Sequence, residues 1–220
     1  MSAREKIFAT LRRDLGGPRP PAKVEAEARL LAAEAALSRP QLSSPDLVEA
    51  FCARLLSPKV VGASVERVAR LEDVPAAVLA YCAAQGLAPA IALQPDAALA
   101  ALGWSGVTLH ASAARDEAVA VGRARWAIAE TGTFVFHSGA DTPVLLAFLP
   151  LHHICVIEAE RILGHLEDYA AAEAGKPAPR NVNFITGASG TSDIEGRLVR
   201  GAHGPAFLHG IIVDPRGAAR

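Results

Sequence analysis

The sequence predicts an α/β fold of three layers, in which a mostly parallel β-sheet lies between two layers of helices. Short apolar runs alternate with helical patterns along most of the chain, which is typical of parallel sheets covered on both faces. Residues 90–93, Ala-Ile-Ala-Leu, have no polar side, as expected of a strand buried on both faces. With 220 residues that are 51% hydrophobic, the chain can bury a core of the required size.

The first predicted element is a helix that begins after Ser2. Ser2 and Glu5 have the spacing of a capping box, apolar residues then recur at helical spacing, and Gly16-Gly17 followed by prolines ends the helix. Residues 1–21 are therefore predicted to form an N-terminal helical arm and linker, and residues 22–220 a single domain.

The later elements are predicted from hydrophobic periodicity and from their glycine and proline boundaries. The segments predicted to be helical are 23–37, 45–56, 75–85, 95–102, 141–148 and 160–174. The segments predicted to be strands are 59–61, 90–93, 107–109, 118–121, 152–157, 181–186 and 207–213.

Composition and cysteine usage exclude several classes of function. The 22 Lys and Arg residues balance 23 Asp and Glu residues, so nothing points to nucleic acid. Cys52, Cys82 and Cys155 form no Cys-x-x-Cys pair, which is typical of a reducing compartment and excludes an iron–sulfur cluster held by this chain alone. The histidines lack a His-Glu-x-x-His pattern, and no uncharged run reaches membrane-spanning length. We expect a cytoplasmic protein without a metal site or a membrane span.

A glycine turn at residues 187–191 has two interpretations. The capping-box spacing from Ser192 to Glu195 predicts a helix directly after it, and the hydroxyls of Ser189 and Thr191 could satisfy the helix-end amides. Alternatively, the turn could hold a ligand. The acidic residues of the predicted first helical turn would repel a phosphate, so a small carboxylate or a neutral polar ligand fits better.

A second stretch, Glu130-Thr131-Gly132, is predicted to lie where a short helix meets a strand. A glutamate at a helix end is usually solvated. If it were buried, its pKa would rise, and it could act as an acid or base or hold a substrate hydroxyl. We predict one cleft with Glu130 as the catalytic residue. The residues predicted to bind the substrate in it are Thr131, Gly132, Gly187, Ser189, Thr191, Asp193 and His203.

Several motifs in the same order resemble the LUD-domain family, of the lactate utilisation protein C type. They are residues 127–133, Leu149-Pro150, His153-Ile154, residues 183–187, Ser189, Thr191, residues 193–195 and residues 201–205. The resemblance is densest between about Gly122 and Asp214 and looser in the N-terminal arm.

The resemblance implies a three-layer fold related to the NagB/RpiA/CoA-transferase group. It also implies a cluster-free, non-redox subunit of a system that oxidises L-lactate to pyruvate, with iron–sulfur clusters in partner subunits and no cofactor in this chain. Gly190 stands where the family turn usually has an arginine, so a carboxylate would lack a bidentate partner at this turn. Two alternatives stay open: a stand-alone enzyme of the CoA-transferase, isomerase or cyclo-ligase type, and a metabolite-binding scaffold.

Overall fold

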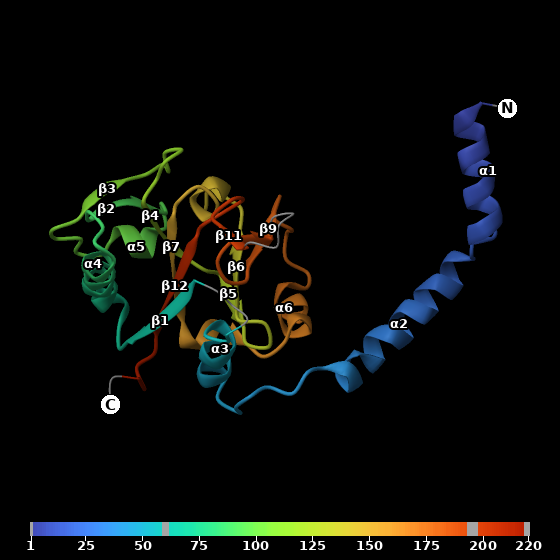
Figure 1. The fold of residues 1–220 in the computed structure, drawn as a ribbon. Coiled ribbons are helices and arrows are strands. Elements are labelled where there is room, and N and C mark those ends of the chain that lie inside the picture. Colours follow the sequence, from blue (N-terminus) through green and yellow to red (C-terminus); the bar gives the residue numbers. More distant parts are fainter. Residues whose placement is uncertain (1, 59–61, 193–197, 218–220) are drawn as a thin grey trace. The chain divides into compact units, whose positions relative to one another are not determined.

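The computed structural model describes residues 2–58, 62–192 and 198–217 (Figure 1). Residues 1–40 and residues 41–220 form two separate units, and each is described by itself. In the described part of the chain, no helix is both long and apolar enough to cross a membrane.

The first unit consists of two helices, α1 (Ala3–Leu15) and α2 (Pro21–Ser38). The predicted capping box is present, because the Ser2 side chain accepts a hydrogen bond from the Glu5 backbone N-H and the Glu5 side chain accepts one from that of Ser2. The helical arm is confirmed, whereas the predicted domain limit at residue 21 stays a prediction.

The second unit is built on a six-stranded sheet in which every neighbouring pair is parallel, which confirms the predicted fold class. The strand order is β1-β12-β7-β4-β2-β3. The strands are β1 (Ala63–Val68), β2 (Ala90–Leu93), β3 (Thr108–His110), β4 (Val119–Arg123), β7 (His152–Glu158) and β12 (Phe207–Val213).

A second sheet, which the sequence did not predict, has the order β8-β5-β6-β9. Strand β6 is antiparallel to both β5 and β9, and β5 is parallel to β8. The strands are β5 (Trp126–Ile128), β6 (Thr133–His137), β8 (Ile162–Leu163) and β9 (Val182–Ile185).

The two faces of the main sheet bury separate cores. On one face, α4 (Val74–Gln85) and α5 (Ala97–Ala100) pack against apolar residues of β2, β4, β7 and β12. On the other face, α3 (Leu47–Leu55) packs with the second sheet, where Phe51 meets Phe134 edge to face at a centroid distance of 5.0 Å. Helix α6 (Leu166–Glu173) contacts β5 and β8 of the second sheet.

Several predicted helices differ from the structure. The prediction of a helix after Ser192 is wrong for the described residues on either side of the gap at 193–197. These residues form strands, because β10 (Gly190–Ser192) pairs antiparallel with β11 (Leu198–Arg200). Thr191 and Val199, both β-branched, lie opposite each other in this hairpin. The acidic residues of the predicted first turn lie outside the described residues.

Two further helices are shorter than predicted, and the stretch around Glu130 has a different structure from the one predicted. Residues 141–148 form only the 3₁₀ turn η2 (Val144–Ala147), which begins after Pro143. In the segment 160–174, the 3₁₀ turn η3 (Ala159–Arg161) and strand β8 come first, so only α6 is helical. The stretch around Glu130 is a hairpin turn between β5 and β6 and not a helix–strand junction.

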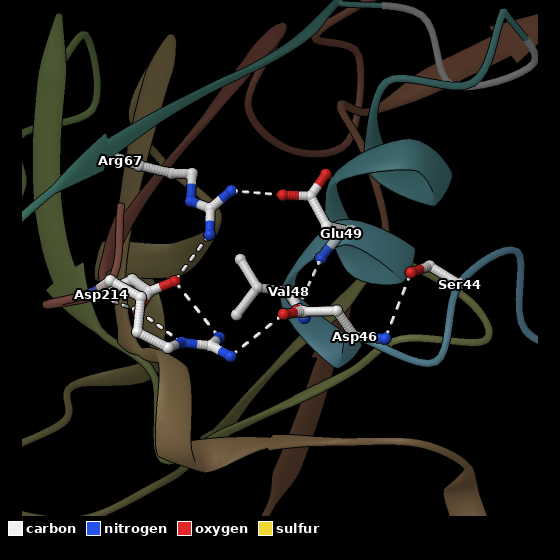
Figure 2. A network of polar contacts seen from close by, with 7 residues as sticks. Ser44, Asp46, Val48, Glu49, Arg67 and Asp214 are labelled. Carbon is white, nitrogen blue, oxygen red and sulfur yellow. Dashed lines mark hydrogen bonds and ion pairs between the residues drawn. The ribbon is translucent and has the colours of Figure 1, made fainter. Parts of the chain in front are cut away.

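A network of ion pairs closes the end of β1 and β12 against α3 (Figure 2). Asp214 is fully buried, and its carboxylate accepts hydrogen bonds from Arg67 Nη2 at 2.6 Å and from Arg216 Nε at 3.1 Å. Arg67 also pairs with Glu49 of α3, and Arg216 Nη1 donates to Asp46 at 3.0 Å. Burial opposes the charge of Asp214, but these hydrogen bonds lower its pKa to about 2.

Candidate functional site

A polar pocket of about 270 Å³ opens at the carboxyl ends of β2 and β4. The chain leaves β2 for β3 on one side and then returns as β4 on the other side of β2. Ligand sites in open parallel sheets form outside the carboxyl ends of strands at such a switch point. We call this cavity the carboxyl-edge pocket.

Gln94, which directly follows β2, forms the floor of the carboxyl-edge pocket and is only 3% exposed. Its Oε1 accepts a hydrogen bond from the Arg123 backbone N-H at 2.8 Å, and its Nε2 donates to Thr142 Oγ1 at 3.0 Å. Gly122 makes this fit possible, because a Cβ there would lie 3.0 Å from Gln94 Oε1. Both ends of the amide are therefore used, and the floor is fixed.

Arg123, at the end of β4, is held within the wall of the pocket. Its Nε donates to Glu158 Oε1 at 2.8 Å, its Nη2 pairs with the same oxygen, and its Nη1 reaches Asp96 Oδ2 at 3.4 Å. Partial burial opposes its charge, but the hydrogen bond and charge of Glu158, together with Asp96, raise the pKa of Arg123. These carboxylates occupy its donors, so Arg123 shapes the pocket more than it offers a free guanidinium.

The guanidinium of Arg125 is held in place by the carboxylate of Glu173, in α6. Glu173 accepts hydrogen bonds from Arg125 Nε at 3.1 Å and Nη2 at 3.2 Å, and also from Trp126 Nε1 at 2.8 Å. Burial opposes the Glu173 charge, but the hydrogen bonds from Arg125, Trp126 and Lys176 lower its pKa to about 2. Arg161 follows on the pocket wall and donates to the Arg125 carbonyl at 3.4 Å.

The opposite wall carries neutral polar groups at the end of β6. His137 Nε2 lies 2.8 Å from the Tyr169 hydroxyl, and Ser138 Oγ accepts from the Asn181 N-H at 2.8 Å. Burial and the nearby charge of Arg125 lower the pKa of His137, so the imidazole is neutral near pH 7. A neutral imidazole can either donate or accept a hydrogen bond, depending on its tautomer.

A second cleft, of about 630 Å³, opens at the amino ends of β4 and β7. We call it the amino-edge cleft; it is lined by residues 115–118, 148–151 and 201–204. Ser189 lies next to this last loop, since its N-H donates to the Pro205 carbonyl at 2.7 Å and its Oγ accepts from the His203 N-H at 3.4 Å. Two of the predicted site residues, Ser189 and His203, thus lie together at the amino edge of the main sheet.

A chain of hydroxyls brings Thr131 to the strand that precedes Gly187. Thr131 Oγ1 lies 2.7 Å from Thr133 Oγ1, which lies 2.6 Å from Thr186 Oγ1. Gly187 follows with a left-handed φ of 77°. Thr191 lies in the β10–β11 hairpin, and the predicted residue Asp193 lies outside the described residues.

Glu130 contacts the first turn of α6. Its Oε1 accepts a hydrogen bond from the Leu166 N-H at 2.7 Å, and its own N-H donates to the Gly164 carbonyl at 3.0 Å. In the described part of the chain, no hydrogen bond joins Glu130 to Ser189. The shared cleft and the catalytic role of Glu130 stay predictions.

We expect Glu130→Gln to lower ligand binding or the activity of the assembled system while changing the free energy of unfolding by less than about 1 kcal/mol. The amide oxygen can still accept from Leu166, so the contact with α6 survives. Thermal melts and an activity assay of the same preparation measure both effects. Unchanged activity would leave only the capping role.

Gly132 brings the backbone close to α3, and its predicted role in binding a substrate stays a prediction. It has a left-handed φ of +68°, and a Cβ there would lie 2.9 Å from the backbone nitrogen of Leu55. We expect Gly132→Ala to cost about 2 kcal/mol of stability in urea denaturation, because both the conformation and the contact are strained.

The matched control is Gly86→Ala. Gly86 is also left-handed, with a φ of +66°, but nothing lies within 4 Å of an added Cβ. It should cost only about 1 kcal/mol, the conformational part alone. Equal losses in the two variants would show that the contact with α3 is unimportant.

The parallel sheet with a polar pocket at its carboxyl edge defines the class of the molecule, an α/β protein with a candidate site for a small ligand. The LUD domain profile matches residues 59–213, and the chain belongs to the LUD domain family.

Relatives and a solved structure resemble the chain over parts of its length. It is 38% identical over 94 residues to "Lactate utilization protein C" of Geobacillus sp. (strain WCH70), 40% of this chain and 39% of that protein. It is 39% identical over 106 residues to the protein of the same name in Deinococcus radiodurans, 47% of this chain and 50% of that protein. The matches thus span half or less of these relatives.

A solved structure of a DUF162 family protein from Deinococcus radiodurans shares the fold. Its TM-score with this chain is 0.54 at 21% identity, and the match covers 79% of this chain and 99% of the other.

Proposed function

We propose that this chain is a non-redox, cluster-free subunit of a system that oxidises L-lactate to pyruvate together with separate iron–sulfur proteins. The observation that carries the proposal is its membership of the LUD domain family, together with relatives named Lactate utilization protein C. Residues 59–213, which match the family, include all of the main sheet and both clefts.

The placement of the cysteines supports a division of labour between this chain and its partners. Cys52, Cys82 and Cys155 lie on three different elements, α3, α4 and β7. Burial raises the pKa of Cys52 to about 11 and that of Cys155 well above its usual range, so both thiols stay protonated at neutral pH. Cluster ligation requires thiolates. The proposal therefore assigns electron transfer to partner subunits.

The test combines genetics with purification. Deleting the gene should abolish growth on L-lactate, and the full chain should restore it. A tagged chain purified from lactate-grown cells should bring iron–sulfur proteins with it, while the purified chain alone should leave L-lactate unoxidised. Normal growth of the deletion strain on L-lactate, or a coloured preparation of the chain alone that lactate reduces, would overturn the proposal.

A further inference from the structure

We propose that the carboxyl-edge pocket binds a short 2-hydroxy or 2-oxo monocarboxylate, with Arg125 and Arg161 holding the carboxylate and His137 and Ser138 contacting the hydroxyl or oxo group. The ligand class rests on the proposed function, which supplies L-lactate and pyruvate as its members. The location rests on the pocket alone.

The cationic side of the pocket is organised before any ligand arrives. Glu173 takes the Nε and Nη2 donors of Arg125 and so fixes the plane of its guanidinium. The Arg161 guanidinium is placed next to it by its contact with the Arg125 carbonyl and by its position over the Trp126 ring, 5.8 Å from the centroid. Both side chains remain partly exposed, so a ligand can reach them. A pre-positioned guanidinium loses less entropy when it binds a carboxylate.

The charge of the wall favours a single negative charge on the ligand. The lining side chains include three arginines, Arg123, Arg125 and Arg161, and two aspartates, Asp96 and Asp141, while Glu158 and Glu173 pair with these arginines from behind the lining. Asp96 is already engaged, because its Oδ1 caps α5 by accepting from the N-H groups of Ala98 and Leu99, each at 3.0 Å. The carboxylates behind the wall would repel a second or third negative charge. A phosphate ester therefore fits less well than a monocarboxylate.

The volume of the pocket and the neutral polar groups on its second wall bear on the length of the ligand and on its 2-substituent. A volume of about 270 Å³ lies just below the usual range for drug-sized ligands, so an acid of three or four carbons fits without filling the pocket. His137 and Ser138 supply one nitrogen and one hydroxyl that can hydrogen-bond a hydroxyl or an oxo group. An acid without that substituent would make no hydrogen bond to the Ser138 hydroxyl or to His137 and should bind more weakly.

The amino-edge cleft provides the comparison. Among the described residues that line it, Arg115 is the one arginine, and it is exposed. Arg115→Gln is therefore a matched control: it removes the same charge from the same protein at the opposite edge of the sheet.

The test is isothermal titration of the purified full chain with L-lactate, pyruvate, propionate and inorganic phosphate at pH 7. Arg125→Gln and Arg161→Gln should each weaken the binding of lactate and pyruvate at least about tenfold, and Arg115→Gln less than about twofold. Propionate, which lacks the 2-substituent, should bind more weakly than lactate. Thermal melts establish folding, and if Arg125→Gln fails to fold because Glu173 loses its partner, Arg161→Gln and Ser138→Ala carry the test.

Three results would overturn the proposal: no binding of either acid to the wild type, loss of binding in Arg115→Gln but not in Arg161→Gln, or phosphate binding as tight as that of lactate. Failure of this site and failure of the proposed function are distinguishable. A chain that restores growth on L-lactate but binds neither acid leaves the function standing, whereas binding with normal growth of the deletion strain removes the function alone.

Discussion

Asp214→Ala is expected to lower the free energy of unfolding by about 3 kcal/mol at pH 7. The Asp214 side chain is 1% exposed and accepts from two arginines and from the Arg216 backbone N-H (Figure 2). Without the Asp214 carboxylate, the largely buried side chain of Arg67 loses its main counter-charge and keeps only Glu49 as a partner. Urea denaturation followed by circular dichroism measures the loss.

The matched control for this network is Arg216→Ala. The Arg216 side chain is 63% exposed, so its ion pairs are screened by water, and its loss should lower stability much less than the loss of Asp214. A loss in Asp214→Ala no larger than that in Arg216→Ala would show that burial adds nothing to these pairs. The expected difference would show that the pair with Arg67 joins β1 and α3 to the segment after β12.

The parallel sheet was predictable because each of its central strands is buried on both faces. Such strands consist mostly of consecutive apolar residues, which can be recognised in the sequence. Helix α3 was predicted for a similar reason, although it begins two residues later than predicted, where the Asp46 side chain accepts locally from the N-H groups of Val48 and Glu49. Local bonds and unbroken apolar runs leave a direct trace in the sequence.

The second sheet left a weaker trace. Strands β5 and β8 have three and two residues, too short for a periodic pattern, and their pairing joins residues far apart in the chain. Strand β9 was predicted, but it belongs to this second sheet, so its end does not mark the carboxyl edge of the main sheet. That is why Ser189 lies by the amino-edge cleft, although ligand sites were expected at carboxyl ends.

The residues of the carboxyl-edge pocket were missed, although the sequence held a signal for them. Gln94 directly follows β2, Arg123 is the last residue of β4, and Asp214 directly follows β12. Polar side chains directly at the ends of apolar strands meet at one edge of a parallel sheet, whatever their separation along the chain. Arg161 could not be found in this way, because it follows β7 within a 3₁₀ turn.

Lowering the pH from 7 to 5 is expected to reduce the free energy of unfolding by about 2 kcal/mol for each of His153 and His209, about 4 kcal/mol together. Burial lowers the pKa of each from 6.5 to about 4. Between these values the unfolded chain binds a proton that the folded chain does not, so stability falls as the pH falls through this window.

Asp214 and Glu173, with pKa values of about 2, stay ionised at pH 5 and do not contribute. Urea denaturation of the wild type, His153→Leu and His209→Phe at both pH values is the measurement, and each variant should lose about 2 kcal/mol of the pH effect, to which the lowered pKa values of His137 and His152 also contribute. Ser64→Ala is the control, since it removes the 2.8 Å partner of His209 Nδ1 but keeps the imidazole, and so should lower stability at both pH values without flattening the slope. Equal stability of the wild type at pH 7 and pH 5 would contradict the prediction.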